Sequence, residues 1–231
     1  MRTLVDLADA VVPAVFEKLN KTGNAGHCIL VARVLDQVIE AAGVPSMPMC
    51  VDYEILNPSA LRHVEAGGSL GDLNGDAFEG RTGTGSSRMY DHHVVTIIPQ
   101  GKTATLLDPA IVQVTVNVPG ASLPPLVVAG LPYPVPEQRG FVINGHLLTY
   151  TFHPAQRDFI ANEQWTDEKA AAVYALRVIG RLGIGSAGEY VRQGKASVYG
   201  PPRVHSPRRT NGGRALAVHA RRRSAGAQSA W

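Results

Sequence analysis

Apolar residues recur every three or four positions along the first segment of the chain, and this spacing predicts a helix over residues 3–20. A second helix is predicted over residues 28–42, which are mostly apolar and run into Gly43, a residue type that commonly ends helices. A third is predicted over residues 167–182, because Thr166-Asp167-Glu168 supplies polar residues typical of a helix start. The second helix is apolar on most sides, which predicts that it is buried.

Shorter apolar runs, separated by segments rich in glycine, proline and serine, predict strands. The predicted strands cover residues 47–55, 93–98, 103–107, 111–117 and 139–152. Residues 66–88 are rich in Gly, Ser, Asp and Thr and predict a long loop, whereas residues 119–136 predict a proline-rich connection. Gly101 lies between two of these strands and favours a hairpin there.

The composition is that of a folded protein, with 45% hydrophobic and 18% charged residues among 231. No acidic residue follows Glu189, whereas nine Lys and Arg residues do, although the net charge of the whole chain is only +3. The preceding part is therefore net acidic. This asymmetry predicts one domain over residues 1–190 and a basic, disordered tail over residues 191–231.

The chain has two cysteines, Cys28 and Cys50, which are too few for a fold built on disulfides. Its first residues lack the basic cluster and unbroken apolar run of a signal peptide, and no stretch reaches 18 apolar residues. We therefore expect a cytoplasmic protein with reduced thiols, no membrane association, no cofactor and no resident metal. Cys50 lies within a predicted strand and is expected to be a core residue.

Cys28 is the first candidate for chemistry, because it lies at the predicted start of an apolar helix. Backbone N–H groups are unpaired in the first turn of a helix, and the helix dipole is positive there. Both effects favour a thiolate, which is the reactive form of cysteine. A neighbouring imidazole would stabilise that thiolate and later deliver a proton to a leaving group.

The predicted hairpin offers this imidazole together with a carboxylate. His93 begins the first strand and Asp108 ends the second, so antiparallel pairing about the turn places the two residues roughly opposite each other. Asp108 would accept a hydrogen bond from one ring nitrogen of His93 and leave the other nitrogen for Cys28. Neighbouring strand residues face opposite sides, so only one of His92 and His93 can do this. His93 matches Asp108 better, and His92 is the alternative base.

These motifs, taken in order, resemble the transglutaminase-like branch of the papain-like cysteine enzymes. Gly26-His27-Cys28 opens an apolar helix, and Ala42-Gly43-Val44-Pro45 then leads into a strand. His93-Val94-Val95 and Leu107-Asp108-Pro109 are similar to the family's histidine strand and its Asp-Pro end. The resemblance covers about residues 20–115. It implies an α+β fold with a papain-like core, in which the cysteine-bearing helix packs on an antiparallel sheet. It also implies Cys28 as nucleophile, His93 as base and Asp108 as orienting acid.

The expected activity is thiol-dependent acyl transfer, or hydrolysis of an amide or isopeptide bond, through a thioester. A peptide or protein amide is the expected substrate; protease, transamidase and acetyltransferase chemistry all stay open. Two alternatives remain. The first is a catalytically inactive transglutaminase-like binding module, whose arginine-rich tail binds polyanions weakly. The second is a zinc site formed by Cys28, His92, His93 and Asp108, although their spacing matches no compact zinc motif.

Overall fold

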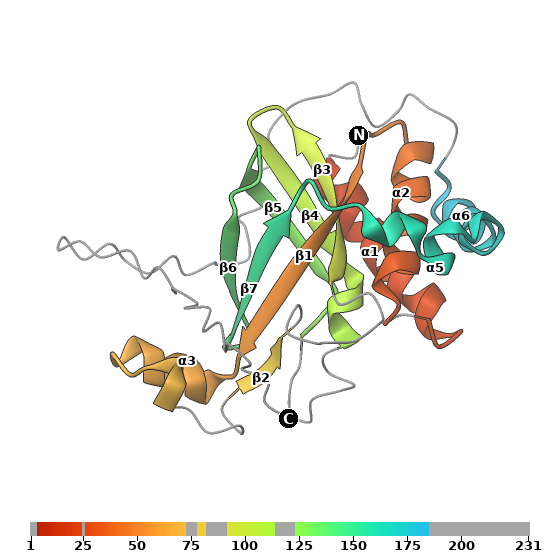
Figure 1. Ribbon diagram of the computed structural model, residues 1–231. Coiled ribbons are helices and arrows are strands. Elements are labelled where there is room, and N and C mark those ends of the chain that lie inside the picture. Colours follow the sequence, from red (N-terminus) through yellow and green to blue (C-terminus); the bar gives the residue numbers. More distant parts are fainter. Residues whose placement is uncertain (1–3, 25, 73–77, 82–91, 114–122, 185–231) are drawn as a thin grey trace, which may run out of the picture.

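The computed structural model describes residues 4–24, 26–72, 78–81, 92–113 and 123–184. Its centre is an antiparallel sheet in the order β5-β4-β3-β1-β7-β6, with helices gathered beside it (Figure 1). The short strand β2 pairs with the far end of β1, beyond the stretch that pairs with β3. The strands are β1 (Met47–Leu56), β2 (Phe78–Arg81), β3 (His93–Gln100), β4 (Thr103–Asp108), β5 (Leu126–Pro132), β6 (Gln138–Ile143) and β7 (His146–His153).

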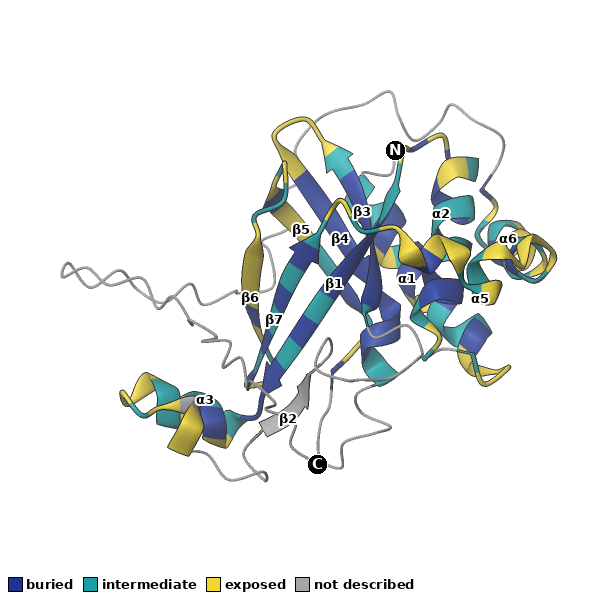
Figure 2. Cartoon of the chain, in the orientation of Figure 1, coloured by how far each residue is buried: buried dark blue, intermediate teal, exposed yellow. Residues whose placement is uncertain are grey.

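The three long helices are α1 (Leu4–Asn20), α2 (Cys28–Ala41) and α6 (Glu168–Leu182), and they pack on one another. Helix α2 also contacts β1 and β3, so it attaches the helical layer to the middle of the sheet. Most of α2 is buried, as the sequence predicted (Figure 2). The short helical elements are α3 (Pro58–Glu65), η1 (Leu70–Asp72), η3 (Pro109–Val112), η4 (Asp158–Ala161) and α5 (Glu163–Thr166).

The sheet separates two hydrophobic clusters. One face of the sheet curls around a core that includes Met49, Val51, Ile97, Leu106 and Tyr150, all at most 1% exposed. The other face is covered by α1, α2 and α6 through a second cluster of apolar side chains. Because side chains alternate along a strand, neighbouring positions in β1 or β3 face opposite sides of the sheet. On the helical side, Cys50 and Val94 belong to a third, smaller cluster with Ile29, Ala32 and Phe159.

The α+β class is confirmed, as are the three long helices and the strands beginning at residues 47, 93 and 103. The strand expected over residues 111–117 is wrong at its start, because η3 occupies Pro109–Val112; residues 114–117 lie outside the described part. The segment expected as one strand over 139–152 is the hairpin of β6 and β7, which turns at Asn144 and Gly145, both with positive φ.

Several further elements were not predicted, among them β2, which lies within the expected loop over residues 66–88. Strand β5 lies inside the expected proline-rich connection and pairs with β4, and α3 follows β1 directly. Most of the expected loop over residues 66–88 and the whole expected tail over 191–231 fall outside the described residues. Among the helices that are described, none has the length and apolar character needed to cross a membrane.

The start of α6 provides a stability prediction. The Asp167 side chain accepts a hydrogen bond from the backbone N–H of Ala170 at 3.0 Å and so caps the helix. We expect Asp167→Ala to lower the free energy of unfolding by about 1 kcal/mol, since an N–H group of the first turn loses its partner. Asp167→Asn retains a capping oxygen and should stay close to the wild type. Urea denaturation of the three proteins tests this, and equal losses in both variants would contradict the capping role.

Candidate active site

His93 and Asp108 form a buried pair where β3 begins and β4 ends. Each residue is 1% exposed, and the Nε2 atom of His93 lies 2.9 Å from both carboxylate oxygens of Asp108. The two strands are neighbours in the sheet, so backbone pairing holds both side chains. The predicted contact between His93 and Asp108 is therefore present.

The register of the hairpin differs from the expected one. Thr96 pairs with Leu107 and Gln100 with Thr103, because the turn consists of Gly101 and Lys102. Leu107 lies opposite Thr96, so Asp108, the next residue, does not lie directly opposite His93. Its side chain reaches His93 diagonally along the same face of the sheet. His93 and Asp108 still touch, although the predicted register was wrong, because diagonal neighbours on one face of a sheet lie within reach of long side chains.

Asp108 has further donors around it. The Tyr150 hydroxyl donates to Oδ2 of Asp108, and the backbone N–H of Ile111 donates to Oδ1 at 3.0 Å. The ring of Tyr53 meets the ring of His93 edge-on, with centroids 5.6 Å apart. The carboxylate is thus held by side chains and backbone in a dry environment, which fixes its orientation toward the imidazole.

The electrostatic state of His93 follows from this setting. Burial alone would lower the pKa of His93, but the adjacent Asp108 carboxylate outweighs it, and with a further contribution from the Cys28 side chain the pKa rises to about 10. Burial, reinforced by the charges of Asp108 and Cys28, also raises the pKa of Tyr53 to about 12. His93 therefore carries its proton at neutral pH, in an ion pair with Asp108.

Cys28 is the first residue of α2 and is partly buried. The preceding residue, His27, makes no capping hydrogen bond through its side chain, and its Nδ1 atom instead lies 3.2 Å from Nε2 of Gln164. The N–H groups of the first turn are therefore not taken by a side-chain cap at His27. This is the helix-start environment that the sequence predicted for the thiol.

Gln113 connects this segment to the histidine. Its Nε2 atom lies 3.2 Å from Nδ1 of His93, and a Cβ placed on Gly26 would lie 3.3 Å from the Cβ of Gln113. Only glycine permits this approach without displacing the glutamine. His93 lies within hydrogen-bond distance of Asp108 and Gln113, and the Cys28 side chain acts on its pKa, but a closed Cys–His–Asp triad is not shown.

His92 belongs to a different environment from His93. Its Nδ1 atom lies 2.7 Å from Oδ1 of Asp52, and its side chain is 22% exposed. It is His93, rather than His92, that contacts Asp108. The zinc set of Cys28, His92, His93 and Asp108 is therefore wrong, because the two neighbouring histidines face opposite sides of the strand and engage different carboxylates.

Cys50 is 0% exposed within β1, so its prediction as a core residue is confirmed, and neither cysteine is in a disulfide. The sequence reasoning missed Tyr150 and Gln113. Tyr150 lies in β7, whose alternation of buried and half-buried residues matches a strand with one face inward. That pattern indicates that the ring faces inward. It does not indicate that the hydroxyl contacts Asp108, 42 positions earlier in the chain.

Comparisons of the chain with protein-family models, with curated proteins and with solved structures found no match.

Proposed function

We propose that the protein is a thiol-dependent enzyme of the transglutaminase-like kind, with Cys28 as nucleophile, His93 as proton carrier and Asp108 as the residue that orients the imidazole. The observation that carries the proposal is the fully enclosed contact between His93 and Asp108. Burying an ion pair is costly, and a buried, strongly perturbed imidazole is more typical of a reactive site than of a structural one.

Three observations support Cys28 as the partner of that imidazole. Asp108 occupies Nε2 of His93, which leaves Nδ1 on the opposite edge of the ring. That nitrogen faces Gln113, which in turn packs against Gly26, two residues before Cys28. The Cys28 side chain also contributes to the raised pKa of His93. A small movement of the Gln113 amide would open Nδ1 to the thiol, and unliganded sites commonly have loose catalytic contacts.

The proposed reaction has two half-steps. The Cys28 thiolate attacks the carbonyl carbon of an amide, the C–N bond breaks, and the departing amine takes the proton of the His93 imidazolium. Water or a second amine then attacks the thioester and gives its proton to His93, and the C–S bond breaks to release the thiolate. First-turn N–H groups of α2, including that of Cys28, would stabilise the oxyanion in both steps.

The papain-like core is part of this proposal. It is supported by a cysteine at the start of a helix that packs on an antiparallel sheet, and by His93 and Asp108 on neighbouring strands. The inactive binding module with a polyanion-binding tail is the outcome to be expected if the thiol proves unreactive.

The test is the rate at which iodoacetamide labels Cys28 at pH 6, followed by mass spectrometry. We expect labelling about tenfold or more faster than in His93→Ala, because the imidazolium stabilises the thiolate. Buried Cys50 should label slowly and serves as an internal reference. Exposed His63, which lies in α3, provides the matched control His63→Ala, with an expected rate equal to wild type.

A second measurement covers the case in which His93→Ala does not fold. Asp108→Asn keeps the shape of the side chain and should also slow the labelling. A blocked glutamine peptide, offered with and without hydroxylamine, tests for the thioester through hydroxamate formation that Cys28→Ser abolishes. Equal labelling rates in the wild type, Asp108→Asn and His63→Ala, without hydroxamate, would refute the enzyme proposal.

A further inference from the structure

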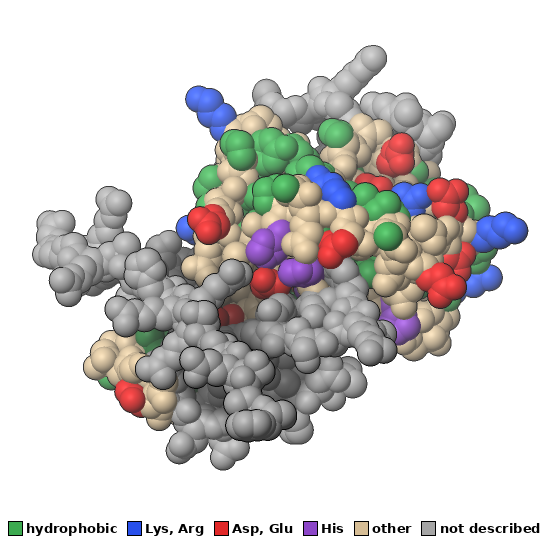
Figure 3. All heavy atoms as spheres, viewed as in Figure 1, with side chains coloured by type: hydrophobic (Ala, Val, Ile, Leu, Met, Phe, Trp, Pro, Cys, Tyr) green, Lys and Arg blue, Asp and Glu red, His purple; other side chains and the backbone are tan. Residues whose placement is uncertain are grey.

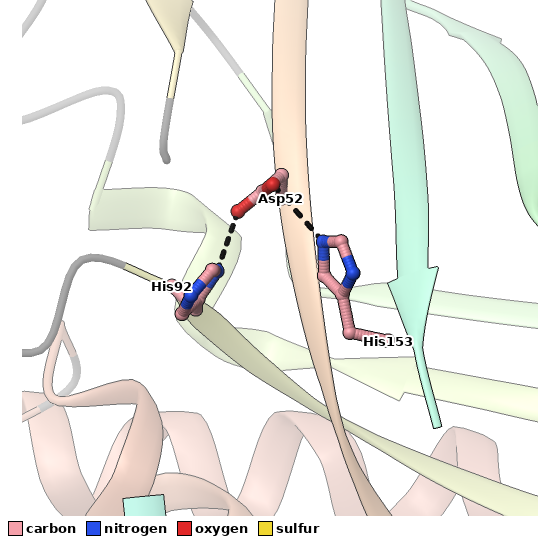
Figure 4. Close-up of side chains that lie close together, drawn as sticks. All are labelled: Asp52, His92 and His153. Atoms are coloured by element: carbon pink, nitrogen blue, oxygen red, sulfur yellow. Dashed lines mark hydrogen bonds and ion pairs between the residues drawn. The ribbon is translucent and has the colours of Figure 1, made fainter. Parts of the chain in front are cut away.

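A second cluster of titratable side chains lies on the face of the sheet opposite to His93 and Asp108. Asp52 lies between two imidazoles, with Oδ1 2.7 Å from Nδ1 of His92 and Oδ2 3.0 Å from Nε2 of His153 (Figure 4). The two rings meet edge-on, with centroids 5.4 Å apart. One ligand atom from each of the three residues lies within 4.8 Å of the others. The proposed reaction uses none of these residues.

Strand geometry explains why the three residues meet. Val51 pairs with His93, so the next positions along the two antiparallel strands bring Asp52 beside His92. On the other edge of β1, Cys50 pairs with His153, and Asp52 follows Cys50 by two positions on the same face. Asp52 and His153 therefore come from the paired strands β1 and β7, and His92 is the residue that directly precedes β3.

The three side chains of the cluster are partly exposed. The side chains of His92, Asp52 and His153 are 22%, 29% and 31% exposed. Figure 3 shows histidine side chains at the molecular surface beside an acidic group. The cluster can therefore be reached from solvent.

We propose that Asp52, His92 and His153 bind a divalent first-row transition metal ion, with Zn²⁺ the best match. Two imidazole nitrogens and one carboxylate oxygen are the donor set of many zinc sites that keep a fourth position open. The same set also suits Fe²⁺ and related ions, whereas Mg²⁺ and Ca²⁺ prefer oxygen ligands throughout.

The side chains must move to accept the ion. Zinc bonds to nitrogen and oxygen are about 2.0–2.2 Å long, which places tetrahedral donor atoms about 3.4 Å apart. The present separations of 2.7 and 3.0 Å between the Asp52 oxygens and the imidazole nitrogens would widen as the ion replaces the shared protons. The ligand atoms of all three residues, which lie within 4.8 Å of one another, would adjust to the tetrahedral spacing. Rotation about the side-chain bonds supplies this change without moving the strands. The negative carboxylate offsets part of the charge of the ion.

Gln156 is placed to support one ligand. Its Nε2 atom lies 2.7 Å from Nε2 of His92 and 3.3 Å from Oδ2 of Asp158. When Nδ1 of His92 binds the metal, Nε2 carries the ring proton and needs an acceptor, which the Gln156 amide oxygen supplies after a half-turn of the amide that gives up its hydrogen bond to Asp158. Such outer partners hold metal-binding imidazoles in position. The cluster thus consists of three metal ligands and Gln156, which supports the ligand His92.

The experiment measures metal binding to the full chain in the Cys28→Ser background, which removes a competing thiol and makes the result independent of the proposed reaction. We expect one Zn²⁺ per chain by equilibrium dialysis with elemental analysis, and visible absorption bands when Co²⁺ is added. Asp52→Asn and His153→Ala should each weaken binding by about tenfold or more. Ca²⁺ should not compete at equal concentration.

Controls separate this site from other histidines. His63→Ala and the double variant His205→Ala/His219→Ala, the latter outside the described residues, should bind Zn²⁺ like the parent. Circular dichroism of Asp52→Asn and His153→Ala verifies that they fold, and Asp52→Asn, the more conservative change, decides the question if His153→Ala does not. Absence of Zn²⁺ binding, or equal binding in the parent and both site variants, would overturn the proposal and leave a metal-free His–Asp–His hydrogen-bond network.

Discussion

Replacing Asp108 by alanine should lower the free energy of unfolding by about 3–5 kcal/mol, the range expected when one partner of a buried ion pair is removed. Asp108 accepts hydrogen bonds from His93, from the Tyr150 hydroxyl and from the backbone of Ile111. All three donors lie in the interior, and no water can replace the carboxylate without opening the core. Urea denaturation of the wild type and Asp108→Ala measures the difference.

Tyr150→Phe is the matched control for this loss. It removes one hydroxyl donor, keeps the ring in the core and leaves the contact between His93 and Asp108 in place, so the expected loss is about 1 kcal/mol. Asp108→Asn should fall between the two, since it retains the shape but not the charge. A loss in Asp108→Ala no larger than that in Tyr150→Phe would show that the pair contributes little to stability.

The stability of the protein should fall as the pH rises from 6.5 to about 10. The pKa of His93 is about 10 in the folded protein, against an ordinary value of 6.5 in the unfolded chain. Below pH 6.5 both states hold the proton and the stabilisation is fully present. Between the two values the unfolded chain has released the proton, so unfolding becomes easier, by up to about 1.4 kcal/mol per pH unit for one proton.

Denaturation in urea at a series of pH values, with a chelator present, measures this slope. The wild-type chain is used, because the Cys28 side chain contributes to the raised pKa of His93. Burial raises the pKa of Tyr53 to about 12 and also raises that of Tyr150, so these residues reduce stability only above pH 10. Asp108→Asn should flatten the curve between pH 6.5 and 10. An equally steep curve in Asp108→Asn would mean that another group causes the loss.

The sequence alone predicted those elements whose local signals agree with their tertiary setting. Helices α1, α2 and α6 have apolar faces that match the helical repeat, and β1, β3 and β4 are apolar runs bounded by turns. Strand β5 was missed because prolines surround it and its pairing with β4 supplies the order that its sequence lacks. The hairpin of β6 and β7 was merged into one strand because its Asn144-Gly145 turn was read as part of a strand.

Some contacts of the candidate site could likewise be predicted from the sequence, and others could not. The chain order places His93 and Asp108 at the two ends of one hairpin, so their contact could be predicted from the local sequence. The contacts of Asp108 with Tyr150, and of Asp52 with His92 and His153, join positions 40 to 101 residues apart. These contacts depend on the order of the strands in the sheet. The local pattern of apolar and polar residues does not reveal that order. The sequence therefore determined which residues can do chemistry, whereas the tertiary structure decided which carboxylate each histidine meets, because neighbouring strand residues face opposite sides of the sheet.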